Sequence, residues 1–81
     1  MTTNENLNKT ERAIFHLLDE EKRWMDFDAI FQSLNPNIKC FSYAAVYKNI
    51  RSLTQKELVA SCKFHPYKQH FFCVKSILVN N

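Results

Sequence analysis

The chain has 81 residues, of which 46% are hydrophobic and 23% are charged, and its formal net charge is +3. This length allows about one small domain, and the composition is too apolar for a disordered protein. No apolar run approaches the ~20 residues of a bilayer span, and no signal-peptide pattern opens the chain, so we expect a cytoplasmic protein without a membrane partner. Three cysteines at loose spacing (Cys40, Cys62 and Cys73) do not suggest a secreted disulfide framework, and we expect reduced thiols.

The charges are divided unevenly between the two halves of the chain. Residues 1–35 carry seven acidic and four basic side chains, whereas residues 36–81 carry seven basic side chains and one acidic one. Such segregation is typical of a nucleic-acid binder, because cations that neutralise phosphates release counterions. A solvated, lysine-bearing surface is the simpler alternative.

Two helices are predicted in the first half. Asn8, followed by Glu11, fits a capping box, and apolar residues then recur at helical spacing to about Asp19. After an acidic turn, Asp26 can cap a second helix with apolar positions at Phe27, Ile30, Phe31 and Leu34. The sequence NPN at residues 35–37 ends it, because the residue before a proline avoids the helical region.

A third helix is predicted in the stretch FSYAAVYKNIRSL, residues 41–53. Ser42 supplies the N-cap, and Val46, Ile50 and Leu53 form the buried stripe. The opposite face then carries Ala44, Tyr47, Lys48 and Arg51.

The pattern after Glu57 changes to that of a β-hairpin, with strands in LVASCKF and HFFCVKSILV and a loop at PYKQ. This loop predicts three cross-strand pairs: His65 with His70, Phe64 with Phe71, and Cys62 with Cys73. Three helices followed by a hairpin indicate an α+β winged helix, a helix-turn-helix core with a β-hairpin wing. We expect one domain over residues 1–81, with residues 1–8 a flexible N-terminus.

Several segments resemble the ferric uptake regulator (Fur) family of bacterial metal- and peroxide-responsive repressors. FSYAAVYKNIRSLTQKELV is similar to the family's recognition-helix signature, in which A-T-V-Y-R precedes a leucine-rich stretch ending in G-L-V. MDFDAIFQSL resembles S-A-E-E-I-Y-x-x-L, and HFFCVKSILV resembles H-L-I-C-x-x-C-G-x-V. The likeness covers roughly residues 10–79 and implies a transcriptional regulator, repressor-like, that reads DNA through Tyr47.

The departures from the family pattern concern metal and dimerisation. Ser76 follows Cys73 where the family's structural zinc site has its second cysteine, and Trp24 replaces a histidine that binds the sensory metal. His70 alone remains of the histidine cluster before the cysteine. The family's dimerisation domain would begin where the sequence stops, at Asn81, so the chain is either a domain of a longer protein or a stand-alone relative.

The residues expected to contact DNA lie on the third helix and on the wing. An aromatic ring can contact a thymine methyl group, and cations bind guanine or phosphate. The predicted set is Ser42, Tyr43, Ala44, Tyr47, Lys48, Arg51, Lys63 and Lys68, with Tyr67 and His65 as further wing contacts. In the simpler interpretation, the Tyr47 ring covers the edge of the core and the long cations lie along the surface.

Metal binding and catalysis have less support in the sequence. Cys62, His65, His70 and Cys73 are zinc-ligand types, but residues three apart on a strand point to opposite faces. We therefore expect no cofactor, and Cys62 and Cys73 would then be small buried hydrophobes. Zinc bound at these four residues is the alternative. The sequence has no phosphate-binding glycine loop and no nucleophile–base motif, so we expect neither an enzyme nor a small-molecule substrate.

The leading hypothesis is therefore sequence-preferring binding to double-stranded DNA. The family resemblance implies an AT-rich site, and the small footprint of one winged helix favours an inverted repeat bound by a homodimer. The candidate dimer contacts are Trp24, Tyr67 and the final segment SILV. The competing hypothesis is a winged helix that binds protein through Trp24, Tyr43, Tyr47 and Tyr67.

Overall fold

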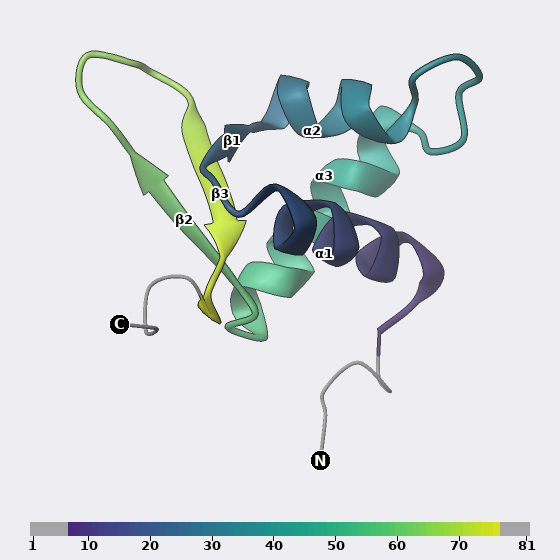
Figure 1. Cartoon of the computed structure of the whole chain (residues 1–81), viewed down its shortest axis with the longest axis horizontal. Helices are drawn as coiled ribbons and strands as arrows, with labels where there is room; N and C mark the ends of the chain where they lie inside the picture. Colours follow the sequence, from purple (N-terminus) through teal and green to yellow (C-terminus); the bar gives the residue numbers. More distant parts are fainter. Residues whose placement is uncertain (1–6, 77–81) are drawn as a thin grey trace.

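The computed structural model describes residues 7–76 and forms a winged helix (Figure 1). The elements run in the order α1 (Lys9–Glu21), β1 (Met25–Asp26), α2 (Phe27–Leu34), α3 (Tyr43–Gln55), β2 (Val59–Lys63) and β3 (His70–Val74). In Figure 1 the three helices form a cluster, and the long hairpin of β2 and β3 stands at one side of it. The predicted α+β class is confirmed.

Each helix begins at the capping residue that the sequence predicts. The Asn8 side chain accepts from the Glu11 N–H at 2.7 Å, and the Glu11 carboxylate accepts from the Asn8 N–H at 2.9 Å, which completes the capping box of α1. Asp26 accepts from the Ala29 N–H, and Ser42 accepts from the Ala45 N–H. These bonds satisfy N–H groups that a helix cannot pair internally. Helix α1 runs two residues beyond the predicted end at Asp19.

The hairpin is confirmed, but its predicted register is wrong by two residues. Cys62 pairs with Phe71 and Lys63 with His70, so His65 and Phe64 lie in the loop and Cys73 lies opposite Ala60. The Tyr67 N–H donates to the Phe64 carbonyl at 2.7 Å. Because this turn begins at Phe64, β2 ends at Lys63, two residues before the end that the PYKQ loop predicts.

The sheet has a third strand that the sequence did not predict. Strand β1 pairs antiparallel with β3, Met25 with Phe72 and Asp26 with Phe71, so the strand order is β1-β3-β2. A strand of two residues has no periodicity of its own, and only the pairing defines it. It joins the start of α2 to the wing.

The apolar stripes of the three helices meet in one core with the base of the sheet. Ile14, Leu18, Ile30, Val46 and Leu53 are fully buried. Met25, Val59 and Val74 add residues from each strand. The predicted buried face of α3 is thus confirmed, and its opposite face is turned away from the core.

A polar network also ties α1 to α3. Glu11 is buried, and its carboxylate accepts from the Ser52 hydroxyl and from Lys56 Nζ at 2.9 and 3.1 Å. Burial by itself raises the pKa of Glu11, but the hydrogen bonds from Ser52 and the Asn8 backbone and the charge of Lys56 together hold the pKa below its ordinary value. Glu11 therefore serves both its own helix cap and the orientation of α3.

Candidate nucleic-acid interface

The outer face of α3 presents the residues that the sequence selects for DNA. Ser42, Tyr43, Ala44, Tyr47, Lys48 and Arg51 are all exposed. They belong to the cap and the first three turns, and the same helix buries Val46, Ile50 and Leu53 on its other side. The helical period of 3.6 residues places these two sets on opposite faces. The face is therefore open for contact along most of its length.

Two tyrosine rings on this face rest on the aromatic surface of α2. The ring centroids of Phe27 and Tyr43 are 4.6 Å apart, and those of Phe27 and Tyr47 are 6.0 Å apart, both with an edge-to-face arrangement. Phe31 lies 5.5 Å from Tyr43. Even so, Tyr43 is 56% exposed and Tyr47 is 54% exposed. Each ring therefore covers the core edge and still offers surface to a partner, so both interpretations of Tyr47 apply to parts of the same ring.

Pairing in the hairpin decides which of its side chains look toward α3. Residues opposite each other on antiparallel strands share a face, so Ser61 with Phe72 and Lys63 with His70 lie on one side of the sheet. Ser61 Oγ and His70 Nδ1 are 3.1 Å apart. Lys63 and Lys68 are exposed, the latter in the loop.

A groove lies between this side of the hairpin and α3. It has a volume of about 370 Å³, and its lining includes Phe27, Tyr43, Tyr47, Arg51, His70 and Phe72. We call it the wing groove. It brings the predicted contacts of α3 next to Ser61, Gln69 and His70, which the sequence did not associate with α3. Only the register of the hairpin reveals this neighbourhood.

The other side of the hairpin carries a separate aromatic cluster. Trp24 packs edge-on against Phe64 at 5.1 Å, and Phe71 lies 5.6 Å from both Phe64 and Tyr67. Phe71 points to the face opposite its neighbours His70 and Phe72. Trp24 and Tyr67 therefore lie apart from Tyr43 and Tyr47, and the four aromatics of the protein-binding hypothesis do not form one surface.

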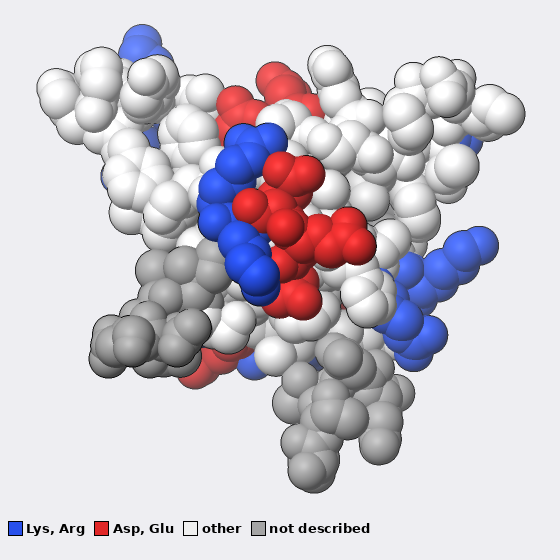
Figure 2. All heavy atoms as spheres, in the orientation of Figure 1, with Lys and Arg blue, Asp and Glu red and all other residues white. Residues whose placement is uncertain are grey.

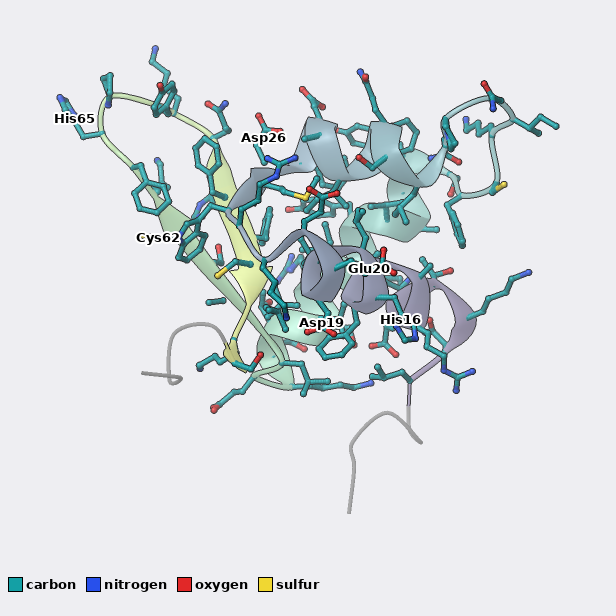
Figure 3. The ribbon with its side chains drawn as sticks, in the orientation of Figure 1. His16, Asp19, Glu20, Asp26, Cys62 and His65 are labelled. Carbon is teal, nitrogen blue, oxygen red and sulfur yellow. The ribbon has the colours of Figure 1, made fainter. Side chains whose placement is uncertain are left out.

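The structure does not support the alternative of a zinc site in the hairpin. Cys62 and Cys73 share one face of the sheet, His70 lies on the other, and His65 lies in the loop away from Cys62 (Figure 3). Within residues 7–76, no group of three or more His, Cys, Asp or Glu side chains is placed to hold a metal ion. Burial raises the pKa of the Cys73 thiol, and the nearby Cys62 adds to the rise. Cys73 is thus a buried apolar residue, as the simpler interpretation predicts, whereas the same prediction for Cys62 is wrong because Cys62 is only half-buried.

Acidic side chains gather on a different surface. Figure 2 shows them in red at the centre of the face that is turned toward the viewer, with a strip of basic side chains beside them. Figure 1, in the same orientation, places α1 there. Asp19 pairs with Lys22, and Glu21 pairs with Arg23, in exposed ion pairs. Asp19 and Glu20 are seen on α1 in Figure 3. This face is unsuited to phosphate, in keeping with the acidic first half of the sequence.

Nothing in residues 7–76 indicates a membrane span. None of the helices there has the length and apolar character needed to cross a bilayer.

Comparison with known proteins identifies relatives. The model of the ferric uptake regulator family matches residues 5–77, whereas no curated protein matches in sequence. The solved structure of GAS PerR-Zn-Zn is 23% identical with a TM-score of 0.75, and the match covers 85% of this chain and 44% of that chain. The ferric uptake regulator of Francisella tularensis with iron is 13% identical with a TM-score of 0.77, covering 93% of this chain and 57% of that chain.

A third similar structure is the adhesin competence repressor AdcR of Streptococcus pyogenes. It is 26% identical with a TM-score of 0.69, and the match covers 94% of this chain and 55% of that chain. The chain thus spans about half the length of these three proteins. They support the winged-helix fold.

These relatives also correct the expectation that no cofactor is involved. PerR is described with zinc and the Francisella protein with iron, so proteins of this kind do bind metals. The family model covers residues 5–77, which is most of the chain. Members of the family are regulators rather than enzymes, and this chain belongs to the ferric uptake regulator family.

Proposed function

We propose that this chain is a DNA-binding module of a transcriptional regulator and that it binds double-stranded DNA with a sequence preference. The observation that carries the proposal is the outer face of α3, where two half-exposed tyrosine rings lie beside the exposed cations Lys48 and Arg51. A helix of this kind fits the major groove, in which base edges and thymine methyl groups are accessible. PerR of Streptococcus pyogenes, a similar structure, is described as a regulator of genes.

The residues of α3 take different roles in this proposal. Tyr47 reads a base, because its ring is aromatic, half exposed and held in place by Phe27. Ser42, Tyr43 and Ala44 form the leading end of the helix, where a small side chain permits close approach. Lys48 binds phosphate or guanine, and Arg51 binds phosphate.

The wing contributes cations to the flanking backbone. Lys63 lies on the side of the hairpin that faces α3, and Lys68 lies in the loop beyond it. Such contacts position a protein on the duplex without reading sequence. One module of this size buries only about 600–1,000 Å² of protein surface on DNA, so tight binding favours two copies on an inverted repeat. We propose a homodimer and, as the family resemblance implies, an AT-rich site.

The test is selection of bound sequences from a randomised duplex pool at near-physiological salt. The original chain, Tyr47→Ala and Tyr47→Phe are compared. We expect a defined motif from the original chain, loss of preference at one or more positions with Tyr47→Ala, and largely retained preference with Tyr47→Phe, which keeps the ring on Phe27. A two-fold symmetric motif would indicate a dimer.

The same experiment separates the alternatives. Retention of DNA without a motif would reduce the proposal to non-specific binding. No retention at low salt would reject DNA binding and favour the protein-interaction module, with Tyr43 and Tyr47 as its exposed aromatic contacts. A motif that survives Tyr47→Ala would show that another residue reads the bases.

A further inference from the structure

The wing groove has walls that are aromatic and largely fixed. Phe27 lies under both tyrosines of α3, with ring distances of 4.6 and 6.0 Å, and Phe72 is held by its pairing with Met25 and Ser61. The pocket volume of about 370 Å³ falls in the range of small-molecule sites, about 300–1,000 Å³. The groove therefore offers aromatic surface and suitable volume to a flat apolar ring.

The polar groups of the wing groove are a guanidinium and side chains that can form hydrogen bonds. Arg51 contributes its guanidinium from α3, and His70 and Ser61 contribute a hydrogen-bonded pair from the hairpin. No acidic side chain belongs to the lining that the described residues form. A guanidinium presents paired N–H donors that match a carboxylate. The chemistry therefore favours an anionic group over a cationic one.

The two ends of the groove differ in charge. A hollow that shares Tyr47 and Arg51 with the groove adds Lys48, whereas a hollow that shares Phe27, Tyr43 and Gln69 adds Asp26 and Asp28. Asp26 accepts from Gln69 Nε2 at 3.2 Å and so remains at that end. An anion would consequently be held near Arg51, with its apolar part extending toward Phe27 and Phe72.

We propose that the wing groove binds a small aromatic carboxylate, with the ring between Phe27, Phe72 and the tyrosines and the carboxylate on Arg51 and His70. Its occupancy would regulate the chain, because the same Tyr47 and Arg51 surfaces are those assigned to DNA. This second part rests on the proposed function: a bound carboxylate and a duplex would exclude each other, and the ligand would act as an inducer.

The first experiment contains no DNA and tests the site alone. The probe is 2-naphthoate, titrated into the ¹⁵N-labelled chain, and its neutral counterpart is 2-naphthalenemethanol. We expect amide shifts concentrated on residues that line the wing groove, with the alcohol weaker than the acid. Arg51→Gln should weaken naphthoate binding by about tenfold, the effect typical of losing a hydrogen bond to a charged group.

The matched control is Arg23→Gln, an arginine that is exposed on the acidic face and paired with Glu21. It should leave naphthoate binding unchanged. His70→Gln provides a second variant from the other wall of the groove and should also weaken binding. Thermal unfolding of each variant checks that the fold is intact. No saturable shifts up to about 10 mM probe, or equal weakening by Arg51→Gln and Arg23→Gln, would overturn the site.

The second experiment adds a duplex from the selection. We expect 2-naphthoate to raise the dissociation constant for DNA in proportion to its occupancy of the groove, whereas the alcohol at equal concentration should have little effect. A ternary complex with unchanged DNA affinity would overturn the regulatory part and leave the site. If no duplex binds at all, the proposed function and the regulation fall together, while the result of the DNA-free titration still decides whether the site exists.

Discussion

The side-chain amide of Asn8 donates to Asn49 Oδ1 across 2.9 Å, and this bond joins the cap of α1 to the middle of α3. Asn49 is buried, and its own amide donates to the Ala45 carbonyl at 2.7 Å. Together with Glu11, Ser52 and Lys56, it forms a polar seam along the contact of the two helices. The seam fixes the rotation of α3 about its axis and hence the direction of its outer face.

Asn49→Ala should destabilise the fold by about 1–3 kcal/mol, because it removes two hydrogen bonds and leaves a polar partner unpaired. The better helix propensity of alanine offsets only part of this loss. Urea unfolding followed by circular dichroism measures the change. The control Asn37→Ala, in the exposed loop before α3, should change stability by less than about 0.5 kcal/mol. Equal effects of the two substitutions would contradict the seam.

The stability of the fold should fall in acid partly through Glu11. Its pKa is lowered in the folded chain, so its contribution is fully present above the unfolded value, about 4.3, and is lost as the pH falls through the folded value. Glu11→Gln should flatten the dependence of unfolding free energy on pH below about 5. The exposed Glu20 supplies the comparison. Glu20→Gln should leave the decrease of unfolding free energy below pH about 5 as steep as in the original chain. An equally steep decrease of unfolding free energy with falling pH in the original chain and in Glu11→Gln would rule out this role.

Arg51→Ala should weaken binding to all duplexes by similar factors and reduce the slope of log affinity against log salt concentration by about 1. The reason is that a phosphate contact releases a counterion and reads no base. Fluorescence anisotropy at several salt concentrations, on a selected duplex and a scrambled one, gives both quantities. Arg23→Ala should leave the slope unchanged. A changed site preference with Arg51→Ala would instead make this residue a base reader.

Asp26→Ala should cost about 1 kcal/mol or slightly more, because the carboxylate caps α2 and also accepts from Gln69. Asp28→Ala, in the first turn of the same helix, removes an equal charge without the cap and should destabilise the fold less. Thermal unfolding compares the two. If Asp28→Ala is the more damaging substitution, charge at the start of α2 matters more than the cap.

Local chemistry explains which parts of the fold the sequence predicts. The three caps depend on residues within three positions of each other, and the apolar stripe of α3 has a clear helical period. Both signals lie within one short segment of sequence. They therefore predict the helices and the winged-helix class, and the structure confirms both. The outer face of α3 follows directly from its buried face.

Features that depend on distant partners could not be predicted in this way. Glu11 looks like an ordinary capping residue until Ser52 and Lys56, 41 and 45 positions away, are placed beside it. The hairpin register depends on a turn that begins at Phe64, in a chain without glycine to mark its turns. That register places His70 on the side of the hairpin that lines the groove together with Arg51, opposite the side of the cysteines, so the alternative zinc site cannot form.

The short strand β1 has a mechanical consequence. Met25 and Asp26 pair with β3, and the same Asp26 is the cap of α2. The hairpin is therefore attached to the helices at the middle of β3 as well as at its own base. A hairpin held at two places cannot swing freely. The distance between the hairpin and α3 is thus fixed by the fold. A duplex or ligand that does not match this distance would have to break the Asp26–Phe71 pairing to enter.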